Sequence, residues 1–200
     1  MKSLRRILIC VALAALSPLP LAAQQPRKVN ITSDSAPGWL PSEAQERQLT
    51  DAVQRYLSAY DHGDFKTAYA TMAPLNQQNI PFDQYAETGR QFNIRSGASV
   101  SHTLVKITWT KDPANAPFPG IYGAVDLSAR YEHIDRDCDY VVLYQPAEGD
   151  DFRLMREESN VLDNTTAQSI EQTKSKAELD AIWAQLSANC PNYEPSTANN

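Results

Sequence analysis

The three histidines are the side chains in this sequence best suited to proton transfer near neutral pH, because imidazole ionises there. His62, His102 and His133 stand far apart, and none belongs to a His-x-x-x-His or Cys-x-x-Cys arrangement. His133 follows an alternating run of apolar residues, so if that run lines a pocket, it stands at the mouth as a general base or ligand donor. A rim histidine without a role is the favoured interpretation, because no partner group accompanies it.

Three aromatic residues join His133 as candidate ligand-binding residues: Tyr69, Trp109 and Tyr131. Their rings can stack on an apolar ligand, although aromatic residues at helix and strand spacing more often pack in a core. The sequence has no nucleophile elbow around a serine and no glycine pattern for phosphates or dinucleotides. We therefore assign no catalytic residue and no cofactor from the sequence.

Alternating acids in residues 135–139 invite comparison with a calcium-binding loop. Such a loop needs glycine at its sixth position and a bidentate glutamate at its twelfth, where this chain has Tyr140 and Pro146. A hairpin turn with local aspartate hydrogen bonds explains the run better, and no metal site is predicted. The adjacent acids Glu157 and Glu158 point to opposite faces of a strand, so they cannot act together on one substrate atom.

The N-terminal segment 1–23 has the order of a secretory signal peptide: a cationic start, ten consecutive apolar residues and small residues before Gln24. Ten apolar residues are too few for a membrane span, which takes about 20 in a helix. We therefore expect a soluble, exported protein, periplasmic or extracellular after cleavage. The 200-residue chain has a net charge of -6, and without the three cations of this segment 15 Lys+Arg face 24 Asp+Glu, or -9. This acidity disfavours nucleic acid and anionic membranes as partners.

Export determines which cysteines remain in the mature chain and whether they form a disulfide. Cys10 lies within the signal segment, which leaves Cys138 and Cys190 as an even pair. In an oxidising compartment such a pair usually forms a disulfide. A bridge across these 52 positions stabilises the fold by about 4 kcal/mol through chain entropy. The alternative, a catalytic thiol beside a histidine, is less favoured.

Hydrophobic spacing predicts the elements that must position these groups. Ser42 and Gln45 form a capping box before an amphipathic stripe, and Gly63 ends that helix. A short helix capped by Asp64 and a third helix after Pro81 follow. Four apolar runs with strand character come next, joined mostly by short turns, and a last helix closes the chain. The runs centre on residues 105–109, 121–131, 140–144 and 152–156.

The segment Val53–Phe65, VQRYLSAYDHGDF, resembles the opening of many nuclear transport factor 2-like, or cystatin-like, domains. Those begin with an amphipathic helix, an elbow of small residue, glycine, acid and aromatic residue, and a second helix with an alanine-rich face, here AYATM at 68–72. The following helix and strands look like the small exported family called domain of unknown function 4019. The resemblance covers about residues 45–160 and departs from the usual Gly-x-Trp-x-Val strand at residues 151–155.

The resemblance implies a curved sheet wrapped around the long helix, a cone whose mouth can hold a ligand, and it implies no reaction. The predicted fold class is α+β: three N-terminal helices packed in a curved four-stranded antiparallel sheet, plus a C-terminal helix. After the signal peptide we expect a flexible lead-in, the α+β domain, a C-terminal helical segment and a disordered tail. Their predicted ranges are 24–41, 42–163, 164–190 and 191–200.

The favoured function is a non-enzymatic, exported module of the cell envelope that binds a small apolar ligand or an envelope protein. The alternative is a small hydrolase or isomerase of the same cone fold, with His133 or an acid at the mouth as the base. A periplasmic inhibitor or chaperone-like module is a third interpretation. A homodimer is compatible with the sequence, whereas nucleic acid binding and a membrane span in the mature chain are not expected.

Overall fold

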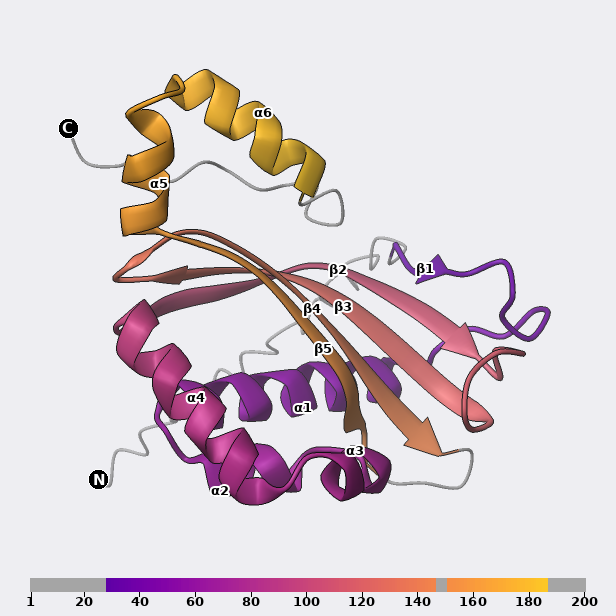
Figure 1. The fold of residues 1–200 in the computed structure, drawn as a ribbon. Helices are drawn as coiled ribbons and strands as arrows, with labels where there is room; N and C mark the ends of the chain where they lie inside the picture. The colour runs from indigo at the N-terminus through magenta and orange to yellow at the C-terminus, as the bar shows by residue number, and fades with distance from the viewer. Residues whose placement is uncertain (1–27, 147–150, 187–200) are drawn as a thin grey trace, which may run out of the picture.

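The computed structural model describes residues 28–146 and 151–186, and these form six helices and one five-stranded sheet (Figure 1). The expected signal peptide and the tail 191–200 lie outside these ranges. Among the described helices, none combines the length and the apolar character that a membrane crossing needs. The elements in chain order are β1 (Asn30–Ile31), α1 (Glu43–Asp61), α2 (Phe65–Ala70), α3 (Pro74–Asn79), α4 (Phe82–Ser96), β2 (Ser99–Lys111), β3 (Gly120–Tyr131), β4 (Ile134–Pro146), β5 (Arg153–Asp163), α5 (Asn164–Glu171) and α6 (Lys176–Leu186).

Helix α1 begins and ends where the sequence predicts. The capping box is present: the Gln45 backbone N–H donates to Ser42 Oγ at 3.2 Å, and the Ser42 N–H donates to Gln45 Oε1 at 2.8 Å. The apolar stripe is buried against the sheet, with Leu49 and Val53 at most 1% exposed. Gly63 follows the helix with a φ of 73°, which glycine adopts without strain. The prediction of an amphipathic helix with a buried apolar stripe is confirmed.

The prediction of a four-stranded antiparallel sheet is wrong. Strands β2–β5 do form an antiparallel meander, but β1 adds a fifth strand that runs parallel to β2. Asn30 and Ile31 lie opposite Thr108 and Trp109, and the Thr32 N–H donates to the Trp109 carbonyl at 3.1 Å. A two-residue strand carries no alternation, so no pattern in the lead-in segment announces it.

The expected helix count is also wrong, since four helices precede the meander and two follow it. Pro74 is the first residue of the unexpected helix α3, where a missing N–H costs nothing. Helix α3 has no buried residue, and α5 buries only Ala167. Without an apolar stripe, neither helix has the periodicity that would reveal it.

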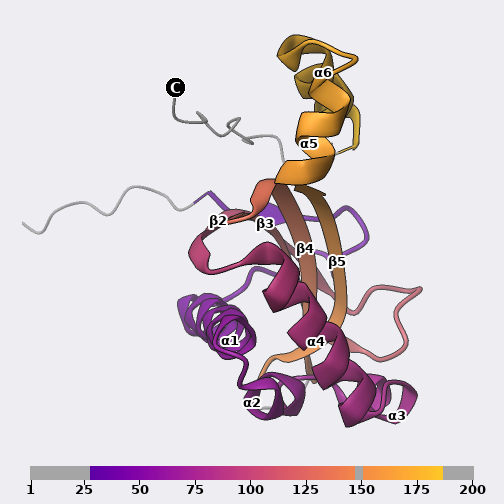
Figure 2. The ribbon, with the colours of Figure 1, turned by 60° about the vertical axis from the view of Figure 1, so that its left-hand side comes forward.

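The two faces of the sheet carry different helices. Figures 1 and 2 show α1–α4 gathered under the concave face, and α5 and α6 apart from them at one end of the sheet. On β4, Arg136 and Cys138 point away from α1 and towards α6: Arg136 Nη2 lies 2.7 Å from Asp180 Oδ1, and Cys138 packs against Trp183. Cys190 lies outside the described residues, so its bridge to Cys138 stays a prediction.

Candidate ligand-binding cavity

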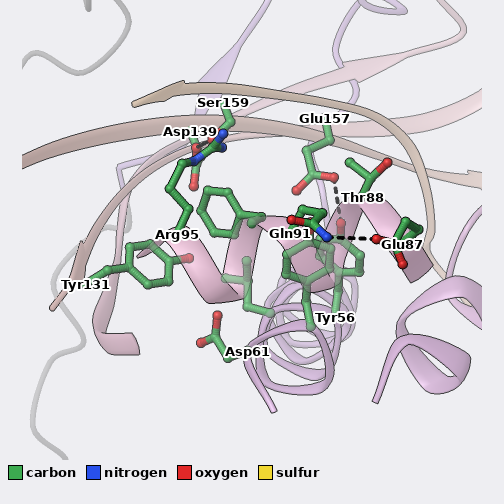
Figure 3. Close-up of a pocket in the computed structure, with 13 residues that line it drawn as sticks. Tyr56, Asp61, Glu87, Thr88, Gln91, Arg95, Tyr131, Asp139, Glu157 and Ser159 are labelled. Atoms are coloured by element: carbon green, nitrogen blue, oxygen red, sulfur yellow. Dashed lines mark hydrogen bonds between the residues drawn. The ribbon is translucent and has the colours of Figure 1, made fainter. Parts of the chain in front are cut away.

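A cavity of about 490 Å³ lies between α1, α4 and the concave face of β3–β5 (Figure 3). This volume is within the usual range for small-molecule sites. One part of its wall is aromatic, formed by Tyr56, Tyr60, Phe92 and Tyr131. The other part is acidic, with carboxyl groups from Asp61, Glu87, Asp139 and Glu157.

The inward acids come from two neighbouring strands. Because side chains alternate along β4, Asp137 and Asp139 point to the concave face, where Val141 packs in the core. Ser159 lies opposite Asp139 on β5, and its hydroxyl donates to Asp139 Oδ1 at 2.5 Å. The hypothesis that residues 135–139 form a hairpin turn is therefore wrong, since they lie within β4.

Glu157, two residues before Ser159 on β5, reaches into the cavity from the same face. Tyr56 on α1 donates its hydroxyl hydrogen to Glu157 Oε2 at 2.6 Å. Glu158 follows on the opposite face of β5, as the sequence predicts for adjacent acids in a strand. Only one member of this acidic pair therefore belongs to the site.

The surroundings of these carboxyl groups favour their neutral forms. Glu157 is an exposed residue of the cavity wall, and partial desolvation by the surrounding protein raises the pKa of its carboxyl group to about 7. Desolvation also raises the pKa values of Asp137 and Asp139. Asp137 is 0% exposed, and after desolvation the charge and the hydrogen bond of Asp139 raise the Asp137 pKa further. The two neighbouring aspartates thus keep a proton at a pH where an exposed aspartate has lost its own.

Tyr131 closes one end of the cavity. Its ring packs edge-on against Phe92 and His102, with centroids 5.5 and 5.7 Å away, and the residue is 9% exposed. Its hydroxyl points into the cavity (Figure 3) and makes no hydrogen bond to any described residue. Behind it, His102 Nε2 lies 2.7 Å from Asp61 Oδ2. The cavity therefore ends in a polar group that is available to a bound molecule.

Arg95 is the one basic residue among those that line the cavity within the described ranges. It is exposed near the C-terminal end of α4, and its Cζ lies 5.8 Å from the centroid of the Phe92 ring. Acidic side chains therefore outnumber basic ones in the wall. In the part of the chain that the structure describes, no group of three or more His, Cys, Asp or Glu side chains is arranged to hold a metal ion.

Of the four residues selected from the sequence as ligand-binding candidates, Tyr131 lines the cavity and the other three do not. Tyr69 lies on α2, and its hydroxyl donates to the backbone carbonyls of Gln77 and Ile80 at 2.9 and 2.8 Å. Trp109 is 1% exposed and packs in the core. His133 lies in the exposed turn between β3 and β4, because β3 ends at Tyr131 and the chain reverses there.

Four residues that matter here were not predicted from the sequence: Asp61, His102, Asp139 and Glu157. Asp61 ends a helix and His102 lies near the start of a strand, and nothing in their spacing predicts contact. Asp139 did leave a signal, because it directly precedes the predicted run 140–144 and shares the alternating face of Val141. Glu157 left none, because strict alternation from Leu154 turns it outward, and only the register shift between β4 and β5 brings it to the concave face. An acid at such a position is costly to bury and therefore indicates a function or a partner.

No curated protein and no solved structure matches this chain. The likeness to nuclear transport factor 2-like domains therefore has no structural relative to support it. The profile of one family, described as a protein of unknown function (DUF4019), matches residues 52–155. This range spans just over half of the chain and includes most of α1, all of α4 and the inward acids of β4. The chain belongs to the DUF4019 family.

Proposed function

We propose that this domain is a non-enzymatic module that binds a small organic molecule in the cavity between α1, α4 and the sheet. The observation that carries the proposal is Tyr131, whose buried ring aims an unpartnered hydroxyl into that space. This hydroxyl is not among the polar atoms sealed inside the described part of the protein; it faces the cavity, where a bound molecule can reach it. A ligand atom in the cavity supplies the missing partner.

The composition of the wall supports the same proposal. Aromatic faces provide apolar contact area, while a few convergent polar groups fix the orientation of a ligand, which is the usual design of small-molecule sites. The sheet that curves over α1 supports grouping the domain with nuclear transport factor 2-like cones. The cationic and apolar order of residues 1–23 supports a location in the cell envelope.

The test is to fill the cavity from one of its walls. Thr88 on α4 lines the cavity and is exposed, so Thr88→Trp places an indole there at little cost to folding. Ile94→Trp is the matched control, because Ile94 is 72% exposed on the same helix and does not line the cavity. The neutral fluorescent probe N-phenyl-1-naphthylamine should bind the unchanged chain and Ile94→Trp with similar affinity, and Thr88→Trp at least about tenfold more weakly, a difference of about 1.4 kcal/mol.

Equal binding of the probe to all three proteins would show that it binds elsewhere, and would contradict the proposal. Lack of binding to the unchanged chain would contradict it as well. Circular dichroism of each variant checks that the indole has not unfolded the domain.

The second candidate function is acid–base catalysis in the same cavity. One observation favours it: Glu157 lines the cavity with a pKa raised to about 7, which suits a general base near neutral pH. His133 lies outside the cavity, so the base in this alternative is Glu157. Deuterium exchange at the carbon next to the carbonyl of 2-indanone tests it. Exchange no faster with the unchanged chain than with Glu157→Gln would exclude this candidate.

A further inference from the structure

We propose that the molecule bound in this cavity is an organic cation, a protonated amine carried on an apolar body. This inference rests on the proposed function and names its class of ligand. Among the described residues, four acids line the cavity, Asp61, Glu87, Asp139 and Glu157, against one basic side chain, Arg95. A cation is the species that such a wall attracts.

The aromatic wall is suited to the same charge. Tyr60 stands 5.9 Å from Tyr56 and 6.1 Å from Phe92, and Phe92 stands 5.5 Å from Tyr131, so the four rings form a continuous surface. Cations bind favourably over aromatic faces within about 6 Å of the ring centroid. The chain already makes one such contact, because the Arg95 guanidinium lies 5.8 Å from the Phe92 centroid. The wall therefore accepts a positive charge.

The polar end of the cavity completes the site. The Tyr131 hydroxyl lacks a partner there, and Asp139, which is 9% exposed, receives a hydrogen bond from Ser159 on one oxygen. A protonated amine has several N–H donors and no acceptor, so it can donate to both the phenol oxygen and a carboxyl oxygen of Asp139. A ligand anion would instead be repelled by each lining acid that is ionised, except where it reached Arg95.

Binding of a cation should release protons, because a positive charge beside Glu157 stabilises its ionised form. With its pKa near 7, Glu157 is partly protonated in the free chain at neutral pH. Affinity for a cation should therefore rise as the pH increases from 6 to 8. The groups that face Glu157 are the hydroxyls of Tyr56, Tyr60 and Tyr85 and the carboxyls of Asp137 and Asp139, with Glu87 and Arg95 along the α4 side of the cavity.

Three probes of matched size separate the possible ligand classes: 3-phenylpropylammonium, 3-phenylpropanol and 3-phenylpropionate. Their affinities for the full chain are measured by NMR titration at pH 8, and the measurement for the cation is repeated at pH 6. We expect the cation to bind at least about tenfold more tightly than the alcohol, and the carboxylate to bind most weakly. The cation should bind several-fold more weakly at pH 6.

Arg95→Gln distinguishes the cationic from the anionic probe most sharply, because it should change their binding affinities in opposite directions. Removing this guanidinium removes repulsion, so the cation should bind about three- to tenfold more tightly. Glu157→Gln should weaken binding of the cation by about tenfold, whereas Glu158→Gln, on the opposite face of β5, should leave it unchanged.

Tighter or equal binding of the alcohol or the carboxylate would overturn the inference and leave cavity binding intact. Weaker binding of the cation to Arg95→Gln would overturn the inference too. If none of the three probes binds or competes with N-phenyl-1-naphthylamine, cavity binding itself fails.

Discussion

Replacing Glu157 by glutamine tests whether the cavity desolvates its own acids. The folded chain holds a proton on Glu157 more tightly than the unfolded chain does, because its pKa rises from 4.5 to about 7 on folding. Ionisation of Glu157 therefore opposes folding. The free energy of unfolding should fall as the pH increases from about 4.5 to about 7, and this group should contribute no further change above that range.

The size of the effect follows from the same difference. At about 1.4 kcal/mol per pKa unit, the whole difference between 4.5 and about 7 corresponds to a change of about 3 kcal/mol in the free energy of unfolding. Water in the cavity reaches Glu157 and screens its charge, so we expect about 1–2 kcal/mol. Glutamine keeps an oxygen that can accept the hydrogen bond from Tyr56 but cannot ionise, so Glu157→Gln should lack this part of the pH dependence.

The assay is urea unfolding of the unchanged chain and Glu157→Gln at pH 4 and pH 8. Glu157→Gln should gain about 1–2 kcal/mol relative to the unchanged chain on going from pH 4 to pH 8. Glu158→Gln carries the same change of charge outside the cavity and serves as the control. The reasoning is refuted if both variants respond equally to pH, or if Glu157→Gln loses stability relative to the unchanged chain as the pH rises.

Three further substitutions test a hydrogen bond to Glu157, the packing of α1 on β3, and the ion pair between β4 and α6. Tyr56→Phe removes the 2.6 Å hydrogen bond that lowers the Glu157 pKa, so a carboxyl NMR titration should show that pKa rising further; a fall would contradict the role of Tyr56. Gly123→Ala would place a Cβ 2.4 Å from Leu49 Cδ2 and should cost about 1–3 kcal/mol in urea unfolding. In a Leu49→Ala background that cost should shrink, and strict additivity would argue against close packing of α1 on β3. Asp180→Asn takes one carboxylate from Arg136, which is 1% exposed, and should cost about 1–2 kcal/mol; no loss would show that this ion pair does not anchor α6.

The elements that bury an apolar face were predictable from local patterns. Leu49 and Val53 mark the buried stripe of α1, and the Ser42 capping box marks its start, because a cap and a 3.6-residue period are both local properties. The four strands of the meander alternate for the same reason. Strand β1 and helix α3 were missed, because the former has two residues and the latter buries none.

The cavity itself could not be read from spacing. Tyr131 was selected as an aromatic at the end of an inward strand face, and the turn that follows carries His133 outside the cavity. Asp139 and Ser159 meet because β4 and β5 pair in one particular register, and a shift of one residue would turn one of them to the other face.

The amino-acid sequence by itself determined where α1 begins, which of its residues face inward and that four strands follow, since local hydrogen bonding and hydrophobic periodicity decide those features. Tertiary structure alone decided that acids from a helix end and two strands share one aromatic cavity, and which strand pairs with the lead-in segment. The physical reason is the distance along the sequence over which each kind of interaction acts. Burial patterns act over a few residues, whereas carboxyl groups distant in sequence perturb one another only after strand register and helix packing have brought them together.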